Sequence, residues 1–170
     1  MTNVIIRDET DNDIAAVRHV NLEAFVTHEE ADITDALRDR VEDGVFLVAE
    51  QNGEIVGNIV FSPVELVGFA NARLMALGPM AVLPDLQNRQ IGTALVTAGI
   101  ERCRALGFGA LVVVGHPNFY PRFGFVPAEI HQLTSEWELP PGVFMALPLV
   151  PDYLTGKSGL IKFHPVFSGN

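Results

Sequence analysis

Basic side chains are scarce in this chain. Its 170 residues hold 11 Lys and Arg against 21 Asp and Glu, which gives a formal net charge of −10. Because a nucleic-acid-binding protein needs a cationic face to neutralise phosphates, this balance argues against a nucleic-acid partner. The charge is also uneven: residues 8–54 hold 14 acidic and 3 basic side chains, whereas residues 84–124 carry a net charge of +2.

Cysteine and long apolar runs are also lacking. The single Cys103 cannot form an intramolecular disulfide, and no Cys and His residues are spaced as zinc ligands, so we expect neither a disulfide scaffold nor a metal site. Residues 1–7 do not resemble a signal peptide, and no apolar stretch approaches the roughly 18 residues of a membrane span. These features predict a soluble cytoplasmic protein with no membrane partner.

What is present is a globular composition, with 48% hydrophobic and 19% charged residues. The length suits one domain, because a domain typically has about 100–200 residues. We expect the domain to cover residues 1–150, with residues 151–170 as an extension that packs on it or trails it.

The first half of the chain alternates strand and helix signals. Thr10 and Asp13 resemble a helix capping box, and Asn52-Gly53 is typical of a tight hairpin turn because it readily supplies positive φ angles. The predicted elements are a strand at residues 4–6, helices over residues 11–26 and 30–41, and hairpin strands at residues 45–50 and 55–61.

The second half contains the pattern of a strand, a helix and a buried strand. A strand over residues 74–83 is interrupted at Gly78-Pro79, where a bulge or a splayed strand is expected. A helix over residues 91–106 and a continuous apolar strand at residues 110–114 follow, so the two strands should be parallel with a right-handed crossover. Beyond them we expect a short helix at residues 117–123, the start of a strand at residues 124–127 and a final strand over residues 143–149.

The turn between the strand and the helix is the most informative motif. Gly92 lies at the predicted helix start, where unpaired amides and the positive end of the helix dipole suit a phosphate or pyrophosphate. One glycine in such a turn is a weak signal, and a tight connection without a ligand explains it equally well.

This turn resembles the acetyl-CoA loop of the GNAT superfamily of N-acetyltransferases, whose pattern is (Gln or Arg)-x-x-Gly-x-(Gly or Ala). Gln87, Ile91 and Gly92 fit the pattern, whereas Gln90 stands where the family usually has its first glycine. A second segment, Tyr120-Pro121-Arg122-Phe123-Gly124-Phe125, resembles the family's Tyr-x-x-x-Gly-Phe element. The resemblance covers roughly residues 4–149.

The resemblance implies an α/β fold with a mixed, mostly antiparallel sheet, a parallel βαβ unit and flanking helices. The fourth and fifth strands would splay apart around acetyl-CoA as co-substrate. The residues that would bind acetyl-CoA are Met80, Ala81 and Val82 along the pantetheine arm, with Gln87, Asn88, Arg89, Gln90, Ile91, Gly92, Thr93 and Ala94 around the pyrophosphate.

The implied chemistry is direct attack of an amine on the thioester. Tyr120 is the expected general acid, because a phenol with a pKa of ~10 is protonated at neutral pH and can donate to the leaving sulfur. The other interpretation of Tyr120 is a packing tyrosine beside Phe119 and Phe123. Cys103 lies near the predicted helix C-terminus, where the dipole disfavours a thiolate, so no acyl-cysteine route is expected.

The general base stays open. The family often uses a Glu on the fourth strand, but residues 75–82 contain no carboxylate. His116 is the nearest titratable candidate, with a structural hydrogen-bonding histidine as the alternative. Glu23, Glu29 and Glu30 could orient a cationic amine in the region that lines the acceptor pocket in the family, or form a solvated helix face.

The function that we expect is transfer of acetyl from acetyl-CoA to a primary amine in a ternary complex, with a small molecule or a peptide as acceptor. The acidic residues 8–54 favour a cationic amine. A non-catalytic acyl-CoA-binding or sensing module is the alternative, and a plain interaction domain is a third class. The resemblance to the family also implies that the protein could form a homodimer.

Overall fold

The computed structural model describes residues 3–169, which form two compact units. Unit 1 comprises residues 3–62 and 78–102, and unit 2 comprises residues 63–77 and 103–169. The helices are α1 (Ile14–Ala24), α2 (Glu29–Arg40) and α3 (Ile91–Ala105), and the strands are β1 (Val4–Asp8), β2 (Val45–Gln51), β3 (Glu54–Leu66), β4 (Leu74–Val82), β5 (Ala110–Val114), β6 (Val126–Pro127), β7 (Leu133–Ser135), β8 (Phe144–Pro148) and β9 (Gly159–Lys162). The chain passes between the units within β3, β4 and α3, so these elements contribute to both.

The hairpin of unit 1 confirms the prediction from Asn52-Gly53. Asn52 has φ 54° and Gly53 has φ 80°, the two positive angles that the tight turn requires. β2 and β3 are antiparallel, with Gln51 opposite Glu54, and β1 is antiparallel to β2. The strand order in this unit is β1-β2-β3-β4.

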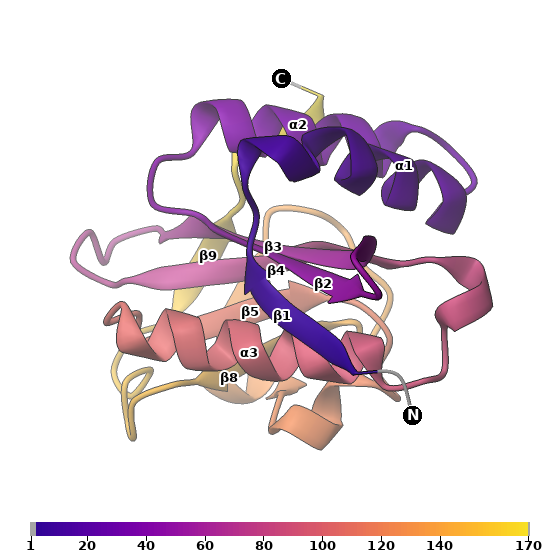
Figure 1. The fold of residues 1–170 in the computed structure, drawn as a ribbon. Helices are drawn as coiled ribbons and strands as arrows, with labels where there is room; N and C mark the ends of the chain where they lie inside the picture. The colour runs from indigo at the N-terminus through magenta and orange to yellow at the C-terminus, as the bar shows by residue number, and fades with distance from the viewer. Residues whose placement is uncertain (1–2, 170) are drawn as a thin grey trace. The chain divides into compact units, whose positions relative to one another are not determined.

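Helices cover both faces of the unit 1 strands, with α1 and α2 on one face and α3 on the other (Figure 1). Neighbouring residues of β3 show this division, because successive side chains of a strand point to opposite faces. A Cβ on Gly57 would lie 3.2 Å from Leu95 Cδ1 of α3, whereas Asn58 Oδ1 accepts a hydrogen bond of 2.9 Å from Asn21 Nδ2 of α1.

The start of the first helix follows the capping prediction, with changed bounds. Asp13 Oδ2 accepts hydrogen bonds from the N–H of Thr10 at 2.8 Å and from its hydroxyl at 3.1 Å. The first turn, Asp11–Asp13, is a 3-10 helix, and α1 ends at Ala24 because Phe25 is extended, with φ −118° and ψ 153°. The second predicted helix is confirmed as α2.

The parallel pair of unit 2 confirms the βαβ pattern. Leu74–Leu77 of β4 lies parallel to Ala110–Val113 of β5, and these four residues of β5 are buried. The pairing ends directly before Gly78, which has φ 125°, so the interruption expected at Gly78-Pro79 is observed. β8 lies antiparallel to β5 and β6, and the strand order in this unit is β3-β4-β5-β8-β6.

The prediction that residues 143–149 form the final strand is wrong. They contain β8, but β9 follows in the C-terminal residues and pairs antiparallel with β3 and parallel with β7. β7 and β9 have three and four residues, which is too short for a reliable alternation of apolar and polar positions. Ile161 of β9 is fully buried in the core of unit 2, so this segment is part of the packing of that unit.

These observations confirm the predicted fold class: a mixed α/β architecture, mostly antiparallel, with one βαβ unit and flanking helices. The expected division near residue 150 stays a prediction. Among residues 3–169, no helix has both the length and the apolar surface to cross a bilayer.

Candidate active site

The predicted acetyl-CoA loop lies in unit 1, between β4 and α3. It begins with a 3-10 turn at Pro84–Leu86 and then passes through two left-handed residues, Asn88 with φ 63° and Gln90 with φ 70°. Ala94 donates the first α3 hydrogen bond, at 3.0 Å to the carbonyl of Gln90. The N–H groups of Ile91, Gly92 and Thr93 are therefore at the open end of the helix, which is the arrangement that binds phosphate.

Gln90 shows how the chain departs from the family pattern. A positive φ is strained for a residue with a Cβ and costs glycine little. Gln90 adopts the left-handed conformation at the position where the family usually has glycine, and its side chain is exposed. With Gln90 in place of glycine, the loop therefore keeps the same left-handed turn, but its backbone is strained at this residue.

Arg89 is the loop's own cation. It is exposed, and within the described part of the chain it makes no ion pair or hydrogen bond. Arg102 is instead paired with Asp8, and Arg122 donates a hydrogen bond of 2.9 Å to the carbonyl of Phe119. Arg89 is therefore available to an anion beside the helix start.

The end of β4 supports the loop from behind. Gln87 Nε2 donates a hydrogen bond of 3.0 Å to the carbonyl of Val82, which ties the first residue of the loop motif to the strand. Gly57 lets β3 pass close to this point, because a Cβ there would lie 3.0 Å from the carbonyl oxygen of Ala81. Met80 and Val82 are half-buried, and Ala81 is buried.

Tyr120 lies in unit 2 at the start of a 3-10 turn, Tyr120–Phe123. Its side chain is 7% exposed, and burial raises the pKa of the phenol to about 12. The ring meets Phe119 and Phe125 edge to face, with centroids 5.0 Å and 5.7 Å apart. Gly115 makes room for it, because a Cβ there would lie 2.4 Å from Tyr120 Cε2.

The Tyr120 environment matches both interpretations from the sequence. The ring packs as a core aromatic residue, yet the hydroxyl forms no hydrogen bond with any residue of the described chain. A fixed phenol with a raised pKa stays protonated far above neutral pH and has its proton free to donate.

His116 contributes its backbone to the same turn. Its carbonyl accepts from the N–H of Phe119 at 3.1 Å and of Tyr120 at 3.4 Å, while its side chain is exposed. The structure therefore links His116 and Tyr120 through their backbones within unit 2.

The three predicted acceptor-binding acids differ from one another. Glu23 and Glu29 are exposed, whereas Glu30, in the first turn of α2, is half-buried. Glu30 Oε1 is removed from solvent and has no hydrogen-bond partner among the described residues. A carboxylate oxygen in this state lacks the donor that buried polar groups normally have.

The polar side chains inside β3 are functional candidates that the sequence alone does not predict. Asn58 is 2% exposed and bonded to Asn21, and Ser62 is fully buried with no partner for its Oγ within the described chain. Asn58 and Ser62 lie four positions apart within the otherwise apolar residues 55–64, and this was the available signal, since such positions share one face of a strand.

The predicted site residues therefore form two groups. The loop, the end of β4 and the three glutamates belong to unit 1, and His116 and Tyr120 belong to unit 2. Across residues 3–169, no three His, Cys, Asp or Glu side chains are arranged to hold a metal ion.

Known proteins show similarity over nearly the whole chain. The model of the acetyltransferase (GNAT) family matches residues 14–125, which include both the loop and Tyr120. YhbS of Escherichia coli K12, named as an N-acetyltransferase, is 30% identical over 169 residues, which are 97% of this chain and 99% of YhbS.

Solved structures agree with this match. The crystal structure of E. coli YhbS in complex with CoA has a TM-score of 0.93 and 28% identity, and the alignment covers 99% of this chain and 93% of YhbS. A GNAT family acetyltransferase from Brucella melitensis in complex with acetyl-CoA has a TM-score of 0.78 and 31% identity, covering 97% and 98% of the two chains. The chain therefore belongs to the GNAT family of acetyltransferases.

Proposed function

We propose that this protein transfers the acetyl group of acetyl-CoA to a primary amine by direct attack in a ternary complex, and that the acceptor is cationic. The observation that carries the proposal is the open N-terminus of α3 beside Arg89, reached through two left-handed residues, in a GNAT chain. The CoA and acetyl-CoA in the two similar structures support the same ligand here.

The residues present fit a pyrophosphate. Three backbone N–H groups, of Ile91, Gly92 and Thr93, have no partner within the helix, and the dipole adds partial positive charge at the same end. Arg89 supplies a full charge that no carboxylate neutralises in the described chain. These groups would hold the phosphates, and the backbone of Met80–Val82 would hold the pantetheine arm.

Tyr120 would serve as the general acid. Acetyl-CoA supplies a thioester, whose carbonyl carbon accepts the amine nitrogen as the carbon–sulfur bond breaks and the thiolate leaves. The phenol of Tyr120 holds one proton with a pKa of about 12 and is held by aromatic contacts on two sides. The phenol is therefore still protonated at neutral pH, and it can donate this proton to the thiolate as it leaves.

Glu30 would bind the acceptor. A rotation of the half-buried Glu30 side chain would present Oε1 to an ammonium group, and the charge-assisted hydrogen bond would supply the donor that this oxygen lacks. Glu23 and Glu29 would add long-range attraction only, since both are exposed. His116 remains the candidate for the base that takes the amine proton.

A non-catalytic acyl-CoA-binding module is the second candidate. It is favoured by one feature of β4: Leu74–Val82 contains no carboxylate where the family often has its base. Such a module would bind acetyl-CoA through the same loop and would not release CoA thiol.

Isothermal titration with acetyl-CoA tests the loop assignment. Gly92→Val places a β-branched side chain at the helix start, and we expect at least tenfold weaker binding than wild type, or about 1.4 kcal/mol. Thr97→Val is the matched control, because Thr97 is exposed later in α3. Retained affinity in Gly92→Val would show that the loop does not hold the pyrophosphate.

A further inference from the structure

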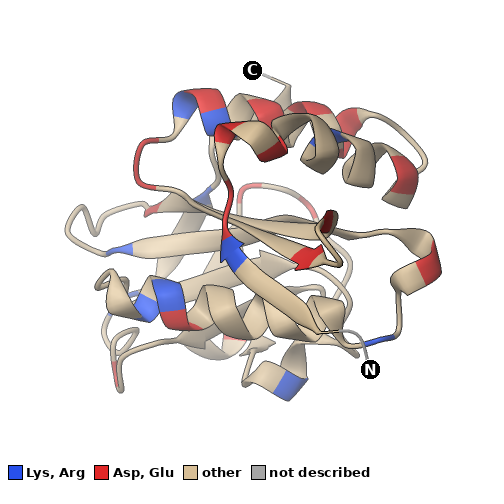
Figure 2. Ribbon diagram, viewed as in Figure 1, with Lys and Arg blue, Asp and Glu red and all other residues tan. Residues whose placement is uncertain are grey.

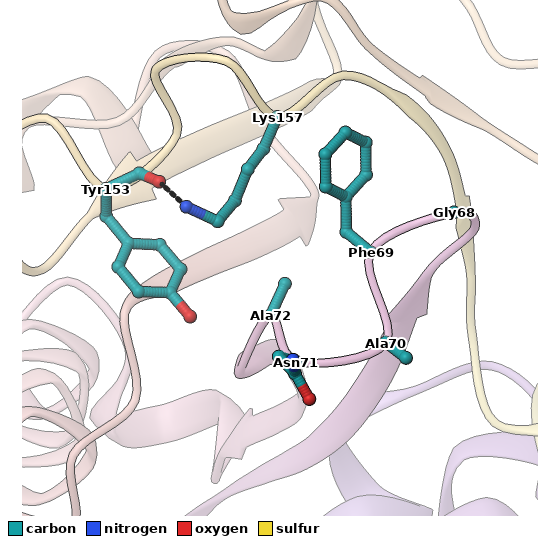
Figure 3. A pocket seen from close by; sticks show the side chains of 7 residues that line it. All are labelled: Gly68, Phe69, Ala70, Asn71, Ala72, Tyr153 and Lys157. Carbon is teal, nitrogen blue, oxygen red and sulfur yellow. Dashed lines mark hydrogen bonds between the residues drawn. The ribbon is translucent and has the colours of Figure 1, made fainter.

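A cavity in unit 2 lies outside all the residues proposed for acetyl transfer. It has a volume of about 500 Å³ and is lined by the β3–β4 connection and by two side chains of the C-terminal segment (Figure 3). The lining residues are Gly68, Phe69, Ala70, Asn71, Ala72, Tyr153 and Lys157.

Tyr153 is the fixed wall of this cavity. Its hydroxyl accepts a hydrogen bond of 2.8 Å from the N–H of Arg73, and its ring stands over Gly109, where a Cβ would lie 2.1 Å from Tyr153 Cζ. A phenol that accepts one bond still has its own proton to donate. Tyr153 therefore offers a ligand both an aromatic surface and one hydrogen-bond donor.

Lys157 is the charged group of the cavity. Its Nζ donates a hydrogen bond of 2.8 Å to the carbonyl of Tyr153, drawn as a dashed line in Figure 3, and lies 4.5 Å from the centroid of the Tyr153 ring. These contacts hold the ammonium in place and use one of its three donors. In the described residues no carboxylate forms an ion pair with it, so a half-buried cation with two open donors faces the cavity without a counter-ion.

The rest of the lining is mainly apolar. Phe69, Ala70 and Ala72 supply carbon surface, and the side-chain amide of Asn71 adds a second neutral polar group. Unit 2 also carries equal numbers of acidic and basic side chains, five of each, whereas unit 1 carries 16 acidic and 6 basic ones. An anion is therefore not repelled by the net charge of the unit that contains the cavity.

We propose that this cavity binds a small carboxylate with an apolar body, such as an aryl or short acyl carboxylate. The carboxylate would accept hydrogen bonds from Lys157 and from the hydroxyl of Tyr153. The apolar body would pack on Phe69 and the two alanines. This chemistry suits a monoanion better than phosphate, because phosphate would leave the apolar wall unused.

The test is an NMR titration of the ¹⁵N-labelled full chain with benzoate, without acetyl-CoA. We expect saturable shifts of the amides of residues 68–72 and 153–157 with a Kd of about 1–10 mM, which corresponds to a weak small-ligand site. Benzamide, which has the same shape and no charge, should bind about tenfold more weakly, since hydrogen bonds to charged groups are the stronger ones.

Lys157→Met retains the apolar stem and should also weaken benzoate binding about tenfold. Lys162→Met is the matched control, because Lys162 is the other lysine of the chain and is exposed on β9; it should bind benzoate as wild type does. Absent shifts in these two segments, equal binding of benzamide, equal displacement by inorganic phosphate, or unchanged binding by a folded Lys157→Met variant would each overturn the proposal. The comparison of benzoate with benzamide uses wild-type protein, so it decides the matter even if Lys157→Met does not fold.

Discussion

Tyr120 is the residue on which the proposed chemistry depends most. Tyr120→Phe removes the hydroxyl and keeps the ring that packs against Phe119 and Phe125. If the phenol is the general acid, kcat should fall by about 10²-fold, which is the usual lower range for removing such a group, while acetyl-CoA affinity stays the same. Steady-state rates and calorimetry on both proteins check this, and an unchanged kcat would remove Tyr120 from the mechanism.

The raised pKa of Tyr120 also predicts a pH dependence of stability. The folded state holds the phenolic proton up to a pKa of about 12, whereas an unfolded tyrosine loses it near 10. This contribution to stability is complete below about pH 10 and is lost as the pH rises towards about 12, by up to about 1.4 kcal/mol per pH unit. Urea unfolding measured from about pH 9 to about pH 12 should therefore show a smaller decline in Tyr120→Phe than in wild type. Equal declines in the two proteins would contradict the raised pKa.

Gln90 tests the cost of the unusual loop. Gln90→Gly should raise the free energy of unfolding relative to Gln90→Ala by about 1 kcal/mol, because both variants lose the amide but only glycine adopts φ 70° without strain. Equal stability of the two variants in urea would mean that the left-handed turn is not strained in this chain.

Glu30 tests the acceptor assignment. Glu30→Gln should raise the KM for a cationic amine by about tenfold, since the charge-assisted bond to the buried oxygen is lost, and acetyl-CoA affinity should not change. Glu29→Gln is the control, because Glu29 carries the same charge in the same helix turn and is exposed. Similar KM values for both variants would assign Glu30 to the helix surface alone.

At the scale of the elements, the packing of α3 depends on Gly99. This glycine is needed for close contact with β3 and not for a turn. A Cβ on Gly99 would lie 2.1 Å from Phe61 Cε1, so β3 and α3 approach each other through this position. Although alanine favours helix more than glycine does, Gly99→Ala should lower the free energy of unfolding by about 1–3 kcal/mol through overpacking.

Thr97→Ala in the same helix is the control for Gly99→Ala. Thr97 is exposed, so this substitution should leave stability within about 0.5 kcal/mol. Urea unfolding measures both variants. A Gly99→Ala variant as stable as Thr97→Ala would show that Phe61 moves aside without cost.

The elements with strong local signals could be predicted from the sequence. Asn52-Gly53 supplied the turn angles, the apolar run at residues 110–114 indicated a buried strand, and Gly78-Pro79 marked the end of the β4–β5 pairing. β7 and β9 could not be predicted, because strands of three and four residues gain their stability from partners far away in the chain.

The candidate site could be predicted only in part. The loop and Tyr120 could be singled out because each lies in a short motif that the sequence shows directly. The distinction between Glu30 and its neighbours Glu23 and Glu29 depends on burial of one oxygen atom, which the sequence does not reveal. The same applies to Lys157 and Tyr153, whose cavity is formed with a connection more than 80 residues earlier in the chain.

At the scale of the whole molecule, the net negative charge lies in one unit. Unit 1 has 16 acidic and 6 basic side chains and so accounts for the entire net charge of −10. Acidic side chains are concentrated on α2 and on the segment before α1 (Figure 2). Arg7, Arg18 and Arg38 each pair with carboxylates and are already counted in this net charge, so the excess that remains is acidic. This distribution favours a cationic acceptor. A cytoplasmic location and a homodimer stay predictions.

The most direct test is the rate of CoA thiol release from acetyl-CoA by the wild-type protein across a panel of primary amines matched in size. The panel should contain cationic, zwitterionic and acidic members, together with a reaction without amine. We predict thiol release that depends on the amine and is fastest with cationic members. Acetyl-CoA binding without thiol release for any amine would contradict acetyl transfer and indicate a binding module, and turnover of acidic or neutral amines alone would contradict the cationic acceptor.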